Sequence, residues 1–534
     1  MNCLNRALKN ITRKKAKTIL LLLTFFLIGN LVIIGIGIST AASQAKILTR
    51  KSMRAAIEYR IDYEYIDEIR NSMSESELEE FMNSDKWEKL TRITSQEYLA
   101  FLNDERVATL NCSSYYQTIL DIDPLPLNNE YEQSNSNEYT SVYEVNGELI
   151  EETRKDPNFK LVTNRVPNMI ELYEGTWTIT EGKFYTQEEI DNAAPVCVIN
   201  DRVAELNGLS IGDTIHLTLT DTISYLNAMG VDTSQLTDTF ELTIVGLYST
   251  VETIDQGNPN FDWMQTSESP FNKVLMPITT YSEFDLPLTI ANWEYNKQLY
   301  PEYADIYSEE NRPTRESVEH VNSIIFLLKD PLDVESFIED YQMDLDYEGR
   351  LFSSDNGTFK KMARPLDSIE LYAKVILAIV ILNAIIIITL VTALTMKTRE
   401  YEIGVLVSLG TSKFKVVAQM FTELLIIALI GFTLSVISGS MIASKAGEAL
   451  LAYQVDVDDE YASDFESDII YYGMDNYFTE VEQKDLIANY EVTISPIIIG
   501  EIYVAGIGIV LLSILVPSMM IMRFNPKKIL TSSL

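Results

Sequence analysis

Four long apolar runs interrupt an otherwise polar chain of 534 residues. Each run has at least about 20 residues, the length that a helix rising 1.5 Å per residue needs to cross about 30 Å of hydrocarbon. We therefore predict four transmembrane helices, at Thr18–Thr40, Leu371–Met396, Val416–Ala443 and Ile497–Met522. The first run also resembles a signal peptide, because small residues follow it. Its length exceeds the roughly 7–15 apolar residues of a signal peptide, which favours a retained helix.

Basic residues accompany the apolar runs on one predicted side of the membrane. They lie in residues 1–17, in the segment 397–415 and in the tail 523–534. Because cytoplasmic segments are enriched in Lys and Arg, we place both termini and the segment 397–415 in the cytoplasm. Residues 41–370 and 444–496 are then outside. The predicted protein crosses the plasma membrane four times.

The N-terminal segment 1–17 carries apolar residues at helical spacing, namely Leu4, Leu8 and Ile11. With its cations on the other faces, it fits an amphipathic helix that lies on the lipid headgroups of the inner leaflet. A plain basic anchor without this helix is the alternative.

The large outer segment, 41–370, mixes strand-like and helix-like patterns. The part up to Asn103 is helical in character, and residues with high β-propensity follow it. We predict strands at Val107–Tyr116, Pro195–Asn200, Thr214–Thr220, Phe240–Tyr248, Val274–Ile278 and Val321–Leu328, a hairpin at Tyr139–Ile150, helices at Asp201–Leu206 and from Pro331, and loops at Pro124–Glu138 and Tyr300–Glu319. The predicted fold class is an α-helical membrane protein with four transmembrane helices and a large α+β extracytoplasmic domain between the first and second.

Charge is distributed unevenly along the chain. The formal net charge is −37, and nearly all of the acidic residues lie outside the predicted membrane helices. The second outer segment, 444–496, is also acidic, which is typical of a solvated surface. An acidic outer domain disfavours nucleic-acid binding.

Motifs for catalysis are absent from the sequence. There is no phosphate-binding Gly-x-x-x-x-Gly-Lys-Ser/Thr, zinc signature or Gly-x-Ser-x-Gly. His216 and His320 are the only histidines, and neither has a nearby Cys or His in the sequence. Cys112 and Cys197 both lie outside and could pair, but the sequence does not decide this. We therefore predict a chain that is not an enzyme and binds no cofactor or metal itself.

Few polar residues occur within the predicted membrane helices. Glu423 and Glu501 lie near the ends of their helices, where snorkelling or a local hydrogen bond is favoured over a functional role. Gly431, Ser435 and Gly439 recur every four residues, a spacing that lets another helix approach closely.

The layout and two motifs resemble the MacB/FtsX-type permeases of ABC transporters. Tyr401–Gly410, which reads YEIGVLVSLG, is similar to the family's Glu-Ile-Gly-x-Leu-x-x-Leu-Gly cytoplasmic segment. The end of the chain, from Pro517 to Leu530, resembles the family's closing Pro…Arg…Pro…Leu pattern. In the outer domain, residues 181–186 and 196–204 are similar to the MacB-type domain. The outer segment 444–496 is longer than the family's usual connection.

The resemblance implies that this chain is a permease subunit that binds a separate ATPase dimer, which would hold ATP and Mg²⁺. It further implies a dimer with a second copy or a similar permease, and motion of the outer domains instead of passage through the helices. A helix over Tyr401–Leu409 would present Ile403, Leu406 and Val407 as one stripe to the ATPase. An ordinary juxtamembrane turn is the alternative. The expected ATPase-coupling residues are Glu402, Ile403, Gly404, Leu406, Leu409 and Gly410.

Three functions are compatible with these features. The first is export or removal of amphipathic peptides, antibiotics or toxins, which an acidic outer surface would concentrate when they are cationic. The second is an FtsX-like role without transport, in which a cell-wall hydrolase, a sensor kinase or an adaptor is the partner. The third is Lol-type lipoprotein extraction, which requires an outer membrane. The residue usage favours a Gram-positive source.

Overall fold

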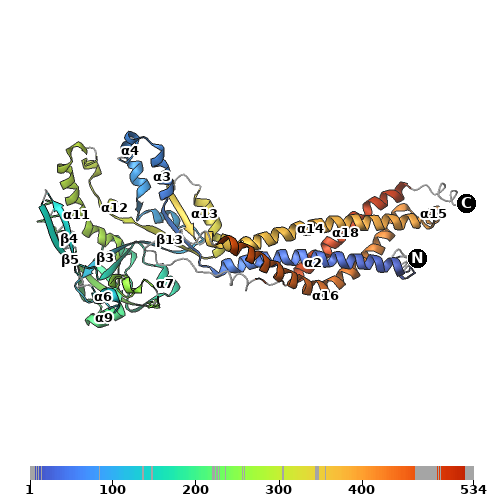
Figure 1. The fold of residues 1–534 in the computed structure, drawn as a ribbon, viewed down its shortest axis with the longest axis horizontal. Helices are drawn as coiled ribbons and strands as arrows, with labels where there is room; N and C mark the ends of the chain where they lie inside the picture. The colour runs from blue at the N-terminus through green and yellow to red at the C-terminus, as the bar shows by residue number, and fades with distance from the viewer. Residues whose placement is uncertain are drawn as a thin grey trace. The chain divides into compact units, whose positions relative to one another are not determined.

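The structure, a computed structural model, divides into two compact units (Figure 1). One is helical and comprises Met1–Met53 and Gly357–Leu534, and the other is a sheet domain, Arg54–Asn356. The structure describes residues 7, 9, 11–13, 15–82, 84–134, 138–145, 148–218, 223, 226–227, 229–234, 236–237, 239–254, 256–257, 259–303, 306–342, 348–354, 356–462, 490, 492 and 495–523.

Among the described residues, four long helices and one short helix form the helical unit. The long helices are α2 (Lys15–Ser52), α14 (Asn356–Thr398), α16 (Lys413–Ala462) and α18 (Pro496–Arg523), and the short one is α15 (Glu400–Ser408). Each long helix contains an apolar window that could cross a membrane, in agreement with the four predicted spans. The 38 residues of α2 extend about 57 Å and the 50 of α16 about 75 Å, well beyond about 30 Å of hydrocarbon.

The helices are therefore longer than the apolar runs from which we predicted them. Helix α2 ends at Ser52, α14 begins at Asn356, and α16 runs to Ala462, into the segment predicted to be an outer loop. The rest of that acidic loop and the C-terminal tail lie almost entirely outside the described residues, as does much of the predicted N-terminal amphipathic helix. The end of an apolar run marks the edge of the hydrocarbon. It does not end the helix, because the main-chain hydrogen bonds of a helix also form in water.

A small apolar core holds the extended ends of α2 and α14 together. Ala41, Ala42 and Ala45 of α2 cluster with Leu366 and Ile369 of α14. Beside this cluster, the Lys46 ammonium lies 2.6 Å from an Asp367 oxygen and 2.7 Å from a Glu370 oxygen. Apolar packing and ion pairs thus join the two helices beyond the predicted spans.

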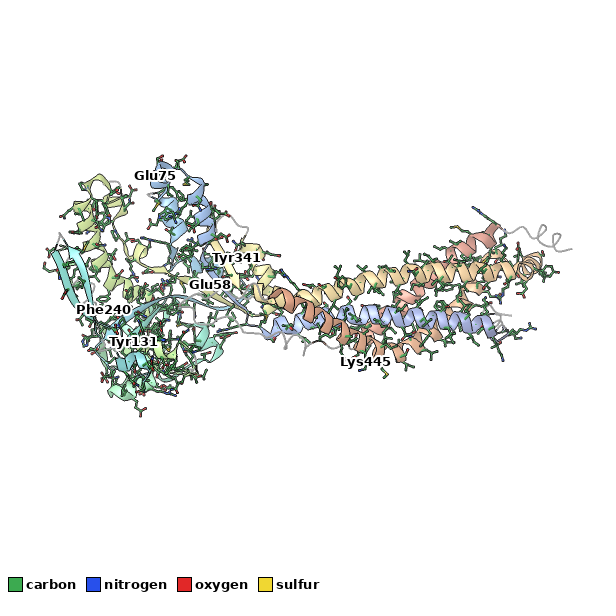
Figure 2. All side chains as sticks on the ribbon, viewed as in Figure 1. Glu58, Glu75, Tyr131, Phe240, Tyr341 and Lys445 are labelled. Atoms are coloured by element: carbon green, nitrogen blue, oxygen red, sulfur yellow. The ribbon has the colours of Figure 1, made fainter. Side chains whose placement is uncertain are left out.

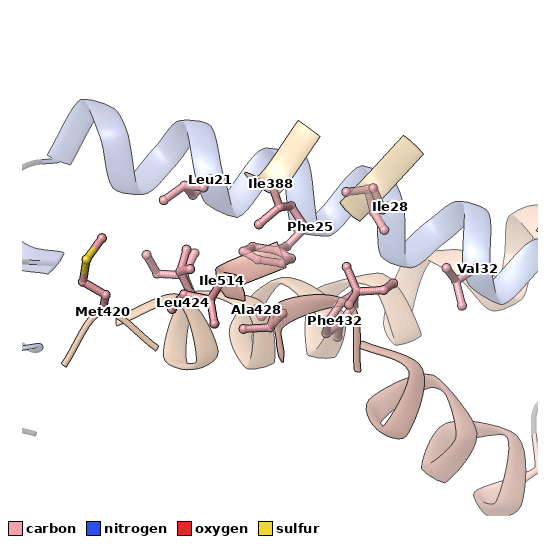
Figure 3. Close-up of a cluster of buried hydrophobic side chains, with 14 of the residues drawn as sticks. Leu21, Phe25, Ile28, Val32, Ile388, Met420, Leu424, Ala428, Phe432 and Ile514 are labelled. Atoms are coloured by element: carbon pink, nitrogen blue, oxygen red, sulfur yellow. The ribbon is translucent and has the colours of Figure 1, made fainter. Parts of the chain in front are cut away.

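Within the membrane part, α2 packs closely on α16. Cβ atoms placed on Gly431 and Gly439 would lie 2.7 Å from Phe25 Cβ and 2.9 Å from an Ile33 carbon. Ser435, between these glycines, donates a hydrogen bond of 2.8 Å to the main-chain oxygen of Phe26. The predicted role of the small residues in helix packing is confirmed. Figure 3 shows Phe25 facing α16 beside this contact.

The sheet domain is built on a ten-stranded mixed sheet. Its strand order is β14-β1-β13-β3-β6-β11-β8-β10-β7, with β9 paired to both β10 and β3. Two small two-stranded sheets, β12-β2 and β4-β5, complete the strands. The bounds are β1 (Ala56–Ile61), β2 (Ile93–Thr94), β3 (Val107–Leu120), β4 (Glu138–Val145), β5 (Glu148–Lys155), β6 (Phe159–Asn164), β7 (Trp177–Gly182), β8 (Val196–Asn200), β9 (Thr214–Thr218), β10 (Thr239–Thr250), β11 (Lys273–Pro277), β12 (His320–Val321), β13 (Ser323–Leu328) and β14 (Arg350–Ser354).

Helices of the sheet domain cover its two main apolar cores. One core lies around Phe101, Phe326 and Phe337, and the other around Phe159, Leu217 and Met276. The helices among the described residues are α3 (Tyr63–Ser72), α4 (Glu75–Met82), α5 (Asp85–Thr91), η1 (Glu97–Phe101), α6 (Glu130–Ser134), α7 (Ile170–Glu174), α8 (Gln187–Asp191), α9 (Asp201–Asn207), η2 (Phe261–Trp263), η3 (Thr266–Glu268), α11 (Ile278–Leu299), η4 (Pro301–Tyr303), η5 (Glu309–Asn311), α12 (Arg315–Val318), η6 (Pro331–Asp333) and α13 (Val334–Gln342).

The predicted α+β class and the four predicted membrane helices are confirmed. The long helix α11 was missed, because Pro287 lies inside it and its apolar residues show little helical periodicity. The segment predicted as a loop at Tyr300–Glu319 contains three short helices. Cys112 and Cys197 are both buried and free, and they lie in separate cores, so the open question of their pairing is answered.

A buried carboxylate on β1 gives the sheet domain a testable pH dependence. Glu58 is 3% exposed within the sheet domain (Figure 2). Burial raises the pKa of its carboxyl, and Arg60 offsets part of this rise. With the folded pKa above the unfolded value, the stability that this group contributes is present at acidic pH and is lost as the pH rises through the folded pKa.

We expect Glu58→Gln to raise the melting temperature at neutral pH and to change it little near about pH 4, where the carboxyl is largely protonated. Glu75→Gln on the exposed face of α4 is the matched control and should change neither value. Thermal unfolding of the full chain measures both. A Glu58→Gln variant that melts lower at neutral pH would contradict this account.

For the membrane helices, we expect Gly431→Leu to lower the free energy of unfolding by about 1–3 kcal/mol, because the new side chain must displace Phe25. Gly500→Leu in α18 is the control, since a Cβ there meets no atom within 4 Å. Unfolding in detergent measures both. Equal stability of the two variants would show that the close approach of α2 and α16 is not needed.

Candidate functional site

The short helix α15 is set off from its neighbours by breaks at both ends. Arg399, between α14 and α15, has φ −110° and ψ 10°, outside helical values. At the other end Gly410 has φ +90°, a left-handed conformation that favours glycine. The Gly410 N–H donates to the Val407 oxygen (3.1 Å) and the Thr411 N–H to the Leu406 oxygen (3.1 Å). Gly410 thus ends the helix, as its sequence position indicates.

The faces of α15 differ from the predicted stripe. Ile403 is 4% exposed and belongs to the apolar core between the membrane helices, and Val407 packs against the same core. The prediction that Ile403, Leu406 and Val407 together face a partner is therefore wrong for Ile403, whereas Val407, like Leu406, is only partly buried. Gly404 is buried as well.

The exposed side of α15 presents other residues. Tyr401 is 58% exposed and Leu409 is 79% exposed, and the Glu402 side chain is 61% exposed. At the start of α16, Phe414 is 77% exposed between Lys413 and Lys415. Of the expected coupling residues, the structure thus exposes Glu402, Leu409 and Gly410 on the surface of this turn.

A groove of ≈ 470 Å³ runs beside this surface. Tyr401, Glu402 and Leu406 form one wall, and Lys9 and Arg13 from the N-terminal segment approach from another. Val416 and Gln419 at the start of α16 also line it. The groove therefore combines aromatic and apolar side chains with charges of both signs, a composition typical of protein-binding surfaces.

A buried ion pair fixes α15 to α16. Arg399 Nη1 lies 2.9 Å from Glu423 Oε2, and the two residues are 5% and 7% exposed. Gln419 donates a hydrogen bond of 3.1 Å to the other Glu423 oxygen. Arg399 Nε is 3.7 Å from a Glu402 oxygen on α15. The favoured local hydrogen bond for Glu423 is present, and snorkelling is not, because the carboxylate is buried.

Glu501 and Asn383 take no part in this site. Glu501 is exposed on α18, and Asn383 donates a hydrogen bond of 2.9 Å to Ile379 within its own helix. Sequence reasoning missed Tyr401, Phe414 and the Arg399–Glu423 pair. A large aromatic residue between two lysines was the available signal for Phe414. No signal in the sequence indicated the pairing of Arg399 with Glu423, because 24 residues separate them.

Two family models match the chain. The MacB-like periplasmic core domain matches residues 30–342, more than half of the chain, and the FtsX-like permease C-terminal domain matches residues 374–526. The chain belongs to the MacB/FtsX family of ABC transporter permeases. A permease of this family works with an ABC ATPase, and its place is the cell membrane.

Two individual proteins are similar to this MacB/FtsX permease. The uncharacterized ABC transporter permease YclI of Bacillus subtilis (strain 168) is 22% identical over 450 residues, which cover 83% of this chain and 80% of YclI. The crystal structure of the periplasmic region of MacB from Actinobacillus actinomycetemcomitans aligns with 57% of this chain and 92% of its own, at 7% identity and a TM-score of 0.28.

We expect Arg399→Ala to destabilise the permease by about 3–5 kcal/mol, because it leaves Glu423 buried without its cation. The double variant Arg399→Met/Glu423→Met should recover most of this loss, since it removes both charges. Unfolding in detergent measures the three proteins. Lys397→Ala, which removes an exposed cation two residues away, is the control. A double variant no more stable than Arg399→Ala would contradict the pairing.

Proposed function

We propose that this permease transmits the ATP cycle of a separate ATPase, docked on α15, to its outer domain. The observation that carries this proposal is the continuity of α14. The helix runs unbroken over 43 residues, about 64 Å, and a single residue separates it from α15 at one end and from β14 at the other. A rigid helix that joins two elements passes a displacement of one to the other.

The sheet register supports transmission through a second helix as well. Strand β1 begins four residues after the end of α2, and β14 ends two residues before the start of α14. These two strands are neighbours in the sheet, with Ile57 opposite Ser354. Any movement of α2 against α14 therefore acts on a single hydrogen-bonded strand pair.

For docking, the proposed ATPase contacts are the exposed residues of the turn and the groove beside it. Exposed aromatic side chains contribute strongly to protein interfaces, because each buries a large area with few rotatable bonds. Tyr401 and Phe414 fit this role, and Glu402 and Leu406 contribute from the groove wall. Ile403, Gly404 and Gly410 act indirectly, since they set the position and the end of α15.

The proposed cargo is an amphipathic peptide, antibiotic or toxin. The sheet domain contains 59 Asp and Glu residues against 19 Lys and Arg, so its field raises the local concentration of cationic molecules. The long α2 and α14 serve equally well if the outer domain regulates a hydrolase or kinase and moves no substrate. This FtsX-like role is the second candidate.

The docking proposal is tested with Tyr401→Asp and Leu409→Asp. Each should weaken association with the co-expressed ABC ATPase about tenfold or more, because a charge replaces an apolar contact. Pull-down and titration in detergent measure this. Both residues are exposed, so membrane levels should not change.

Leu332→Asp, at a 41% exposed leucine of the sheet domain, is the matched control and should leave ATPase association unchanged. If both cytoplasmic variants retain full ATPase binding and ATP-dependent activity, α15 is an ordinary juxtamembrane turn and the proposal is wrong.

A further inference from the structure

A second groove lies within the sheet domain, beside the first half of β3. Its volume is ≈ 560 Å³. Side chains from η1 and the residue after it, including Leu99 and Leu102, form one wall, and the segment 165–168 forms another. Residues 107–110 of β3 lie between these walls. Strand β3 thus contributes four consecutive residues to the lining of the groove.

The strand is paired on one side only along this groove. Strand β13 pairs with β3 from Val107 to Ser113, whereas β6 pairs with it only from Ser113 onward. Cys112 directly precedes Ser113, where the pairing with β6 begins. Its main-chain N–H and C=O both form hydrogen bonds on the β6 side. Its N–H donates to the Asn164 side-chain oxygen (3.2 Å), and its C=O accepts from the Arg165 N–H (3.0 Å).

Leu110, two residues before Cys112, has its main-chain N–H and C=O oriented in the same direction as those of Cys112. In an antiparallel pair, successive residues point their main-chain groups alternately toward and away from the partner strand. The N–H and C=O of Leu110 therefore point away from β13, as those of Cys112 do. Among the described residues, neither group has a protein partner. Such an unpaired main-chain edge is a template for another strand.

Pro167 explains why the chain itself leaves this edge open. After Asn164 the segment would have to continue beside β3 to cover Leu110, but proline has no N–H to donate to a strand. Instead, the main-chain oxygens of Val166 and Asn168 accept hydrogen bonds from the side chains of Asn164 and Thr109. These two main-chain oxygens thus bond to side chains, and the segment does not continue the β6 pairing alongside Leu110.

The walls of the groove provide apolar side chains and one hydrogen-bond donor. Leu99 and Leu102 are 47% and 51% exposed, so they offer apolar contacts without having to move. Arg165 is 9% exposed, and its Nη1 lies 2.7 Å from Asp191. Its Nε has no hydrogen-bond partner among the described residues and can donate to a carbonyl oxygen.

We propose that this groove binds a cationic peptide in an extended conformation, which adds a strand to β3 at Leu110. The unpaired N–H and C=O recognise the peptide main chain, and the leucine wall takes alternate apolar side chains. Charge complementarity selects the cationic class, because the sheet domain has a net charge of −40 and the exposed Glu188 follows Gln187, which lines the groove. The site deepens the proposed function by assigning its cargo, but peptide binding itself requires no ATPase.

The probe is a short peptide of alternating lysine and valine, added to the full chain in zwitterionic nanodiscs without ATPase. We expect saturable binding above that of empty nanodiscs, and hydrogen exchange at the Leu110 amide slowed about tenfold or more. Methylating the main-chain nitrogens that face β3 should weaken binding at least about tenfold, because each loses its proton. Methylating the opposite set should not.

Two variants test the walls of the groove. Leu99→Ser/Leu102→Ser should weaken peptide binding, whereas Leu206→Ser, at a leucine that is also 51% exposed, should not. A peptide with glutamate in place of lysine should not bind. Tyr401→Asp should bind the peptide normally, so failure of ATPase docking and failure of this site are separate results.

Three outcomes would overturn the proposal. If both methylated peptides bind like the parent and Leu110 exchange is unchanged, the peptide associates only with the acidic surface. If the glutamate peptide binds equally, the site does not select cations. If empty nanodiscs bind as much peptide as the loaded ones, the ligand is in the lipid.

Discussion

The close contact between α2 and α16 is the constraint on which the membrane part depends. In hydrocarbon, apolar side chains gain nothing by leaving lipid for one another, so helices associate through close packing and interhelical hydrogen bonds. Gly431 and Gly439 provide the close packing, and Ser435 provides a hydrogen bond to the main chain of α2. Ser438 adds a second bond, of 2.9 Å, to the side chain of Asn30. These contacts fix α16, and α16 in turn carries Glu423, to which Arg399 and hence α15 are tied.

The contacts from α2 to α16, and from Glu423 of α16 to Arg399, connect the membrane core to the cytoplasmic turn. Ile403 continues the apolar core of the membrane helices into α15, so the short helix cannot tilt without disturbing that core. The residues that carry the family motif therefore divide into two groups. Ile403, Gly404 and Gly410 shape the helix, while Tyr401, Glu402 and Leu409 remain exposed. A partner that moved α15 would move α14 with it.

Local patterns predicted much of this structure, and contacts between distant residues account for the rest. Apolar runs identified all four membrane helices, and β-branched, aromatic and apolar content identified strands such as β3, β8 and β13. Helix ends were misplaced, because the hydrocarbon boundary and the end of a helix are set by different forces. The buried side of α15 was missed for a related reason. The sequence of Tyr401–Leu409 does not show which face of the helix packs on the neighbouring helices. The residues near Arg399 in the sequence do not indicate that its partner is Glu423.

The walls around Leu110 also bear on how the protein stays soluble outside the membrane. A bare strand edge on a large sheet invites pairing with the same edge of another molecule, and repeated pairing of this kind leads to aggregation. Here η1 on one side and the turn at Pro167 on the other leave access at the bottom of a groove. In the proposed site, these walls exclude the edge of a complete sheet and leave room for one extended peptide, which limits edge-to-edge pairing between molecules.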